Sequence, residues 1–205
     1  MKNLQEQASY IKDNFADVTV VDPISYDNLI IYVTPEKIIE FLQFLRDDQN
    51  LSFKVLIDLF GADLLGIRAP RFEVIYNLLS LKLNSRLTVK VALEENEEVV
   101  TATTVFSTAG WFEREAFDMY GIVFTGHPDL RRILTDYEFE GYPLRKDFPL
   151  TGYKEVRYDA ELKKVIYEPV KLMQEFRNFD FEMPWIGTAK EAQRAVAKDD
   201  KSNKS

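Results

Sequence analysis

The sequence contains no cysteine. Without thiols a chain cannot form disulfides, hold zinc through thiolates, ligate an ordinary iron-sulfur cluster or use a cysteine nucleophile. Histidine is almost as scarce, because His127 is the single residue of that type. Any redox chemistry linked to this protein is therefore expected to reside in other chains.

Long apolar runs and targeting signals are also missing. Nowhere do about 18 apolar residues follow one another, and residues 1–6 have neither an apolar signal core nor Arg- and Ser-rich transit character. We therefore expect a soluble chain that stays where it is made. The formal charge of -8 disfavours a duplex nucleic-acid binder, which needs a basic face to displace counterions from phosphate.

Length and composition allow one substantial core with an appendage. The chain has 205 residues, of which 46% are apolar, and is short for two full domains. We predict an α/β domain over residues 1–124, an extended partner-wrapping arm over residues 125–186 and a disordered polar tail over residues 187–205.

Apolar residues alternate with polar ones in three segments, which predicts antiparallel strands with one dry face. A β-branched run predicts a further strand, and apolar residues three or four positions apart predict helices. The fold class is α+β, with a mixed or antiparallel sheet of about four strands, helices packed on it and a long extended C-terminal arm. The expected strands lie near residues 29–34, 53–59, 72–76 and 87–93. The expected helices lie near residues 1–15, 35–46 and 108–120. Residues 99–106 could form a further strand or lead into the last of these helices.

Four charges lie inside an aromatic run at residues 113–118. Aromatic flanks imply burial, and buried charges are costly unless each finds a partner. Arg114 precedes Asp118 by one helical turn, so it can pair with Asp118 or with a carboxylate on another element. Ser107 or Thr108 can cap this helix, and Gly121 offers a left-handed stop.

From Thr125 onward, prolines and glycines interrupt the pattern, and we expect no regular helix or sheet there. Eleven aromatic residues nevertheless lie between Tyr137 and Trp185, which is unusual for a disordered tether. We expect this arm to need a second surface, most simply a partner protein, in order to become rigid.

Charge in the arm is balanced, with six basic and six acidic residues between Thr125 and Arg157. Balanced charge favours binding to another protein over binding along the phosphates of a nucleic acid. Arg131, Arg132 and Arg145 are the best interface candidates, because guanidinium pairs bidentately and stacks on rings.

Glu113, Glu115, Asp118 and His127 also invite a metal-site interpretation, since carboxylates and imidazole suit divalent iron, manganese or zinc. The spacing argues against it, because no Glu-x-x-His occurs. A free-standing carboxylate metalloenzyme is the alternative function of another class, but the sequence offers no nucleophile, oxyanion site or nucleotide motif to support it.

Three segments together resemble the C subunit of NADH-quinone oxidoreductase, respiratory complex I. They are residues 113–122 (EREAFDMYGI), 127–134 (HPDLRRIL) and 141–150 (GYPLRKDFPL), and residues 175–181 (EFRNFDF) are also similar to that family.

The resemblance implies a core peripheral-arm scaffold subunit of the proton-pumping enzyme. Electrons would pass from NADH through FMN and iron-sulfur clusters to quinone, with every one of these cofactors held by partner subunits. No independent catalytic activity is implied, and no catalytic, cofactor-binding or metal-binding residue in this chain. An equivalent subunit of a hydrogenase-type or other quinone-linked complex is the alternative, because such complexes share the Glu-Arg-Glu motif.

The implied partners are the D subunit, which lines the quinone cavity, and the neighbouring iron-sulfur subunits B and I. The implied location is the cytoplasmic face of the bacterial inner membrane, or the matrix face of the mitochondrial inner membrane if the gene is organellar, with membrane association only through the complex. The proposed site residues are structural and lie at the junction of domain and arm; they are Glu113, Arg114, Glu115, Asp118, His127, Arg131, Arg132, Arg145 and Asp147.

Overall fold

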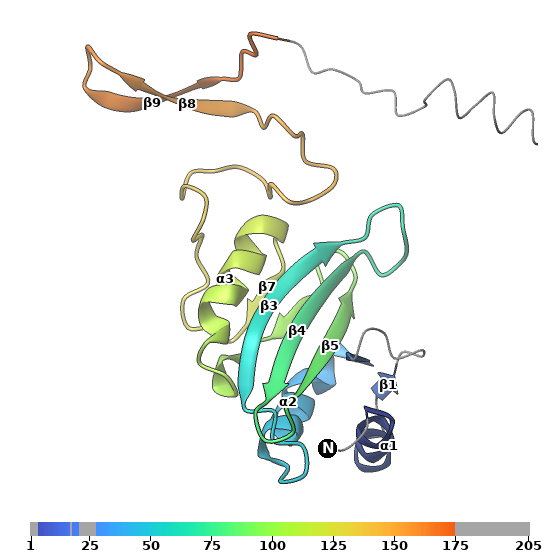
Figure 1. Cartoon of the computed structure of the whole chain (residues 1–205). Coiled ribbons are helices and arrows are strands. Elements are labelled where there is room, and N and C mark those ends of the chain that lie inside the picture. The colour runs from blue at the N-terminus through green and yellow to red at the C-terminus, as the bar shows by residue number, and fades with distance from the viewer. Residues whose placement is uncertain (1–3, 17, 21–27, 175–205) are drawn as a thin grey trace, which may run out of the picture. The chain divides into compact units, whose positions relative to one another are not determined.

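The computed structural model describes residues 4–16, 18–20 and 28–174. The chain divides into two compact units, Met1–Tyr153 and Lys154–Ser205, which are described one at a time (Figure 1). The first unit contains, in chain order, α1 (Leu4–Asn14), β1 (Val18–Val20), β2 (Leu29–Val33), the 3-10 turn η1 (Pro35–Lys37), α2 (Ile38–Asp47), β3 (Val55–Asp63), β4 (Phe72–Ser80), β5 (Ser85–Leu93), β6 (Glu98–Val100), the 3-10 turn η2 (Ala102–Thr104), α3 (Ala109–Tyr120) and β7 (Val123–Thr125).

Five of these strands form one mixed sheet in the order β1-β2-β5-β4-β3. β2 and β5 run parallel, and the other neighbouring pairs run antiparallel. The mixed sheet with helices is therefore confirmed. The strand beyond the expected four is β1, whose three residues are too few to show an alternating pattern.

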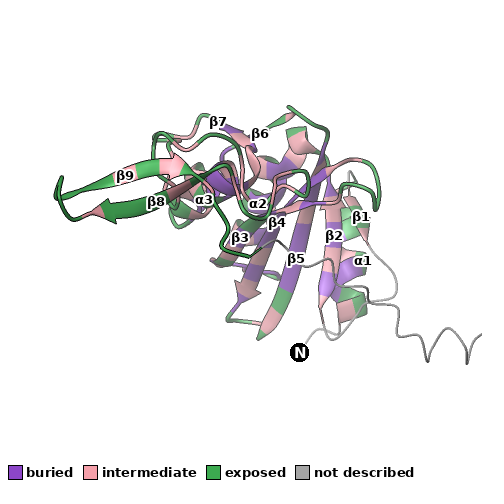
Figure 2. Ribbon diagram, turned by 90° about the horizontal axis from the view of Figure 1, so that it is seen from above, coloured by how far each residue is buried: buried purple, intermediate pink, exposed green. Residues whose placement is uncertain are grey.

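The core lies between this sheet and its helices. Alternate apolar side chains of β4 and β5 are buried on one face of the sheet, and Ile75 of β4 is buried on the other face as well. Figure 1 shows α2 behind these strands and α3 beside β3, and the buried colour in Figure 2 concentrates in the strands. α2 contributes four fully buried residues at helical spacing, Ile38, Phe41, Leu42 and Leu45. Each such side chain stabilises the fold by about 1.5 to 3 kcal/mol.

Helix α3 is bracketed by a small parallel pair, β6 and β7. For residues 99–106 the sequence left open whether the chain forms a strand or leads into the next helix. The structure contains both, because β6 is followed by η2. Thr108 occupies the N-cap position of α3 without a side-chain cap bond. Gly121 ends the helix in the left-handed conformation, with φ of 76°, as predicted.

The second unit contains an antiparallel hairpin of β8 (Lys154–Asp159) and β9 (Lys164–Pro169). The expectation of no regular sheet after Thr125 was therefore wrong. The strands are short, and their turn is built by Asp159, whose Oδ1 accepts backbone N–H bonds from Glu161 and Leu162 at 2.9 Å each. Such an Asx-type turn needs neither glycine nor proline, and a single aspartate in a charged segment is a weak turn signal.

The boundary between the two units also differs from the expected one. We expected the arm to start at residue 125, whereas the first compact unit continues to Tyr153. Residues 126–148, called the docked loop below, are bonded to α3 and to the sheet of their own chain. Residues 175–186 of the expected arm, the expected tail at 187–205 and the motif at 175–181 lie outside the described residues.

Among the described residues, no helix combines the length and the apolar character needed to cross a bilayer.

Candidate architectural site around helix α3

The docked loop folds back onto the end of α3, as the chain path beside α3 in Figure 1 shows. The backbone N–H of Leu144 donates to the carbonyl of Met119 at 3.1 Å, and Arg145 Nε donates to the carbonyl of Tyr120 at 2.6 Å. Both carbonyls belong to the last turn of α3, where no intrahelical donor is left to pair with them. The loop therefore completes the helix end.

Gly121 lets the loop approach this closely. A Cβ at position 121 would lie 2.6 Å from ring atoms of Tyr142 and 2.7 Å from Arg145 Nη2. The positive φ and the close contact both favour glycine here.

Asp118 is the centre of the junction. Its Oδ1 accepts bonds from Arg132 Nη1 at 2.8 Å and from the Thr135 hydroxyl at 2.5 Å. Its Oδ2 accepts three backbone N–H bonds, from Ile133 at 3.0 Å, Leu134 at 2.7 Å and Thr135 at 2.8 Å. The side chain is fully buried, and five donors occupy its two oxygens.

These donors keep Asp118 ionised. Burial by itself raises the pKa of the carboxyl, but the bonds from Thr135, Arg132 and Leu134 outweigh burial and hold the pKa well below its usual range. A carboxylate with such a low affinity for protons and no open lone pair is poorly suited to act as a general base. Asp118 is built to hold the loop.

Arg132 is the matching clamp from the loop side. Its Nη2 donates to the carbonyl of Gly141 at 2.9 Å, while Nη1 bonds Asp118. The guanidinium also lies over the rings of Phe139 at 5.6 Å and Tyr142 at 5.4 Å. The planar guanidinium of Arg132 thus bonds α3 through Asp118 and the later part of the docked loop through Gly141. A lysine could not make both contacts in this geometry.

Within the described residues the bonds of Arg114 go to backbone carbonyls and not to a carboxylate as expected. Its Nε and Nη2 donate to the backbone carbonyls of Arg131 and Arg132 at 3.0 and 2.9 Å. The partner expected for it, Asp118, is taken by Arg132. Arg114 still contributes to the junction, because it holds the chain direction just before the Asp118 contacts.

The burial implied by the aromatic flanks is only partly observed. Glu113 and Asp118 are fully buried, but Glu115 is exposed and Trp111 is 74% exposed. The helix therefore presents an outer face at Trp111 and Glu115. Arg131 is also a surface residue and pairs with Asp129 at 3.0 Å.

Glu113 anchors the other side of α3. Its Oε2 accepts the Thr101 hydroxyl at 2.5 Å and its Oε1 accepts the backbone N–H of Ala102 at 2.6 Å. Burial raises the pKa of Glu113, and the bonds from Thr101 and Ala102 and the nearby His127 offset this in part. The carboxyl thereby ties α3 to η2.

His127 joins the same region through its ring. Nδ1 accepts the backbone N–H of Asp129 at 3.0 Å, so the ring proton of the neutral imidazole is on Nε2. Nε2 then donates to the carbonyl of Gly110 at 2.9 Å, while its distance to Glu113 Oε2 is 3.9 Å. His127 links the loop to the first turn of α3.

A second buried carboxylate, Asp63, anchors the far end of the docked loop. Arg71 Nε and Nη2 form a bidentate pair with its two oxygens at 3.1 and 2.9 Å. The backbone N–H of Lys146 donates to Oδ2 at 2.9 Å. Arg71 Nη2 also reaches the predicted residue Asp147 at 2.9 Å. The loop is thus bonded to the ends of β3 and β4.

The bonds at this anchor also set its charge state. Burial raises the pKa of Asp63, but the bonds from Arg71, Lys146 and Leu65 outweigh burial and lower it to about 2. Arg71 in turn lowers the pKa of Asp147 through a side-chain hydrogen bond.

Arg145 extends this second anchor. Its Nη1 lies 3.3 Å from Glu95 Oε1, and its guanidinium lies over Tyr142 at 4.6 Å and Phe72 at 5.0 Å. The structure therefore divides the predicted residues among three places. Asp118, Arg132 and Arg114 lie at the junction of α3 and the loop, Arg145 and Asp147 at the second anchor, and Glu113 and His127 on the other side of α3. Glu115 and Arg131 are left at the surface.

Sequence reasoning missed several members of this junction. Asp63 could have been found from the sequence. It follows Leu59 and Gly61 at every second position of β3, on the buried face of the strand, where an apolar residue is usual. Thr101 and Thr135 carried none, since a threonine in a loop is ordinary. The missed members are Asp63, Arg71, Glu95, Thr101 and Thr135.

The contacts of the described residues offer no group of three or more histidine, cysteine, aspartate or glutamate side chains placed to hold a metal ion. Glu113 and Asp118 point into different bonding networks.

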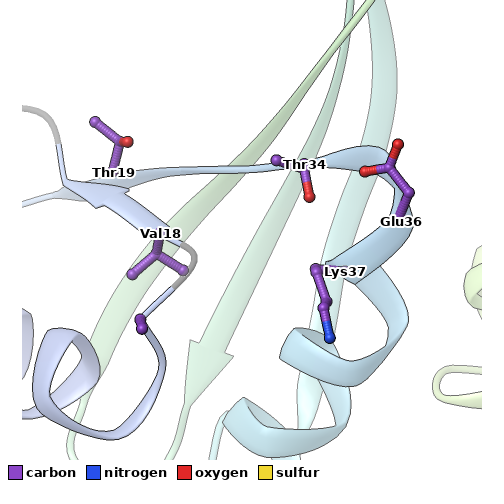
Figure 3. A pocket seen from close by; sticks show the side chains of 6 residues that line it. Val18, Thr19, Thr34, Glu36 and Lys37 are labelled. Atoms are coloured by element: carbon purple, nitrogen blue, oxygen red, sulfur yellow. The ribbon is translucent and has the colours of Figure 1, made fainter.

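A hollow of about 470 Å³ lies between β1 and the start of α2, where Figure 3 shows Thr19, Thr34 and Glu36 around it. None of the predicted site residues lines it. Lys37, which also lines it, pairs with Glu40 at 2.8 Å.

Two solved structures resemble this chain. The first is a trypsin-resistant fragment (1-134) of Nqo5, with a TM-score of 0.51 and 28% identity over 62% of this chain and 99% of that chain. The second belongs to a membrane-bound sulfane sulfur reductase, an archaeal respiratory membrane complex, with a TM-score of 0.63 over 87% of this chain and 98% of that chain. At 21% identity the second likeness shows the fold alone.

Curated relatives match most of the sequence. The C 1 subunit of NADH-quinone oxidoreductase from Rhizobium meliloti (strain 1021) is 57% identical over 90% of this chain and 92% of its own. The C subunit of the same enzyme from Azorhizobium caulinodans is 52% identical over 91% of this chain and 88% of its own. The family model for the 30 kDa subunit of respiratory-chain NADH dehydrogenase matches residues 31–154, which include most of β2, all elements from α2 to β7, and the docked loop. The chain therefore belongs to the family of the 30 kDa subunit of respiratory-chain NADH dehydrogenase, which includes the C subunit of NADH-quinone oxidoreductase.

Proposed function

We propose that this chain is an architectural subunit of NADH-quinone oxidoreductase that contains no redox centre and has no turnover of its own. It would hold neighbouring subunits in place while electrons pass from NADH through FMN and iron-sulfur clusters, bound elsewhere, to quinone. The relatives named as the C subunit of this enzyme support the assignment to the complex.

The observation that carries the proposal is how Asp118 is used. A buried carboxylate in an aromatic region is the kind of group that enzymes adapt for proton transfer. Here all its bonding capacity goes to Arg132, Thr135 and the loop backbone, and its pKa is held low. A fully buried carboxylate is thus used to hold a loop against the domain, which is what a scaffold requires.

The docked loop then acts as a rigid platform for partners. It is joined to the domain at both ends, through Asp118 and through Asp63, and it exposes apolar side chains such as Leu134, Tyr137 and Leu144. Exposed apolar groups on a rigid loop are typical of an interface. The partners we propose are the D subunit, which lines the quinone cavity, and the iron-sulfur subunits B and I.

The part of the chain after the docked loop is proposed to become ordered on those partners. The solved Nqo5 relative is a trypsin-resistant fragment ending at its residue 134, which supports a protected first unit followed by a protease-sensitive extension. The proposed location is the cytoplasmic face of the inner membrane, or the matrix face for an organellar gene, with membrane association only through the complex.

The test uses the tagged full chain purified with its complex in mild detergent. Arg132→Lys is compared with Glu115→Gln, an exposed residue of α3. We expect Arg132→Lys to lower the yield of assembled enzyme and to leave NADH:quinone turnover per assembled complex unchanged, while Glu115→Gln changes neither. Loss of turnover in a complex that is fully assembled would contradict a purely architectural role, as would NADH oxidation by the isolated chain.

A further inference from the structure

The single histidine of the sequence, His127, lies where the docked loop follows β7. Its side chain is only 3% exposed. The ring is bonded on both sides, because Nε2 lies 2.9 Å from the carbonyl oxygen of Gly110 in α3 and Nδ1 accepts the backbone N–H of Asp129 at 3.0 Å. The second of these bonds ties residues 127–131, called the loop start below, to the ring.

The bond to Asp129 requires a neutral ring. Nδ1 accepts a hydrogen bond only while it carries no proton, whereas both ring nitrogens of an imidazolium are donors. A second proton would place a ring N–H against the backbone N–H of Asp129, so this bond must break. Imidazole is the side chain that ordinarily changes its charge between about pH 5 and 8.

A protonated ring would keep its partners on α3. Nε2 is already placed to donate to the carbonyl of Gly110, and Glu113 Oε2 lies 3.9 Å from the same nitrogen. A carboxylate at this distance favours the imidazolium. Burial raises the pKa of Glu113, which limits this attraction in acid, but the Gly110 carbonyl accepts at every pH. The ring can therefore stay on the helix when the loop start leaves.

The other charged and titratable groups around the ring do not supply the same response. Asp129, in the loop start itself, is exposed and pairs with Arg131 at 3.0 Å. Burial, together with the charge of Glu113, raises the pKa of Tyr76 in β4, so its phenol stays neutral in this range. Glu98 of β6 accepts the hydroxyl of the last β7 residue at 2.9 Å. η2 and β7 consist of residues without titratable side chains.

The contacts that follow the loop start confine any opening to it. Arg114 holds the carbonyls of residues 131 and 132, and Asp118 accepts the backbone N–H groups of residues 133–135. The donors of Asp118 keep it ionised far into acid, so this contact does not respond between about pH 5 and 8. The loop start contains Leu130, which packs against the core and would leave it on opening.

We propose that His127 is a pH-sensitive switch for the loop start: the neutral ring holds residues 127–131 against α3, and a proton on Nδ1 releases them. Because the docked ring excludes the second proton and the released ring accepts it, release occurs as the pH falls. The released fraction rises by at most about tenfold per pH unit. The switch goes beyond the proposed function and does not depend on it, since all its groups belong to this chain.

The experiment is an NMR titration of the ¹⁵N-labelled full chain from about pH 8 to 5.5. Because the chain has one histidine, the ring nitrogen signals belong to His127 without further assignment. We expect the Nε2–H tautomer at the alkaline end. As the ring takes up its second proton, protection of the Asp129 amide from hydrogen exchange, corrected for the intrinsic rate at each pH, should fall by at least about tenfold with the same midpoint. Amides 133–135 should keep their protection.

His127→Asn is the matched variant, because asparagine does not titrate and its side-chain oxygen can accept the N–H two residues later in an Asx turn. Protection of Asp129 should then be independent of pH. The proposal is overturned by constant protection of Asp129 in the wild type while the ring titrates, by an equal loss of protection in the variant, or by a ring that takes up no proton. Should the variant not fold, the wild type still decides, since unequal midpoints of ring and amide would also overturn the switch.

Discussion

Arg132 and Asp118 form a buried ion pair, with Nη1 and Oδ1 2.8 Å apart, that joins the docked loop to the last turn of α3. The two residues lie 14 positions apart in the sequence. The further bonds to the Asp118 carboxylate come from Ile133, Leu134 and Thr135, immediately after the arginine. The pair therefore fixes the direction of the loop as well as its position.

Removing the charge of Asp118 should be costly. Asp118→Asn leaves Arg132 without its carboxylate and places amide hydrogens against backbone N–H groups, so we expect the free energy of unfolding to fall by about 3 kcal/mol. Urea unfolding of the purified chain, followed by circular dichroism, measures this. Glu115→Gln on the exposed face of α3 should change it by less than about 0.5 kcal/mol. Equal effects of the two substitutions would show that the pair contributes nothing specific.

Arg132→Lys tests the planar fork while keeping a tryptic site. Lysine keeps the positive charge but cannot bond Asp118 and Gly141 together while stacking on Phe139. We expect the loop to open more often, so that limited trypsin cleavage at position 132 speeds up by roughly tenfold. Arg131→Lys, next to it and at the surface, is the matched control and should cleave at the wild-type rate. No acceleration in Arg132→Lys would mean that the loop is held by other contacts.

Asp63 predicts a loss of stability in acid. Its folded pKa of about 2 lies below its ordinary 3.8, so the folded state prefers the ionised form. The stabilisation is therefore present above about pH 4 and is lost as the pH falls from about 4 to about 2, by about 2 kcal/mol. Asp63→Asn should reduce this acid loss. The check is a series of urea unfolding curves from about pH 2 to 7, and an unchanged acid slope in the variant would refute it.

Glu113 predicts the opposite dependence on pH. Burial raises its folded pKa above the ordinary 4.5, so the folded state prefers the protonated form. Its contribution is complete below pH 4.5 and decreases as the pH rises through the raised folded value. Glu113→Gln, which keeps an acceptor for the N–H of Ala102, should remove this decrease. Unfolding free energies of variant and wild type that stay parallel between about pH 4 and 8 would count against the prediction.

Substitutions at two glycines allow the cost of backbone strain to be measured separately from the cost of a steric clash. Gly121 and Gly66 share a φ of 76°, but a Cβ at 121 meets Tyr142 at 2.6 Å, whereas a Cβ at 66 meets nothing within 4 Å. Gly66→Ala should cost about 1 kcal/mol through its conformation alone. Gly121→Ala should cost at least about 1 kcal/mol more, because the docked loop must shift. Thermal unfolding of both variants gives the difference, and equal costs would mean that the loop yields freely.

Much of the fold could be predicted from local patterns. Side-chain periodicity reports which face of an element is buried, so the strands near residues 72–76 and 87–93 and the helix after Pro35 were predicted correctly. Gly121 was predicted as a helix end because only glycine adopts that conformation without cost. Strand β1 and the hairpin were missed, because three residues show no period and the turn at Asp159 lacks glycine and proline.

The sequence predicted which residues are buried around α3 better than it predicted their hydrogen-bond partners. Motif spacing and aromatic flanks are local properties, so they were enough to identify the family and to predict the burial of Glu113 and Asp118. That Arg132 and Arg145 matter at an interface stays a prediction. The folded chain was needed to show that Asp118 pairs with Arg132 and not with Arg114, and that Asp63 and Arg71 hold the other end of the loop. Such pairings depend on where packing brings residues that are far apart in the chain. Charge and spacing allow several partners for each carboxylate, and the folded backbone selects one.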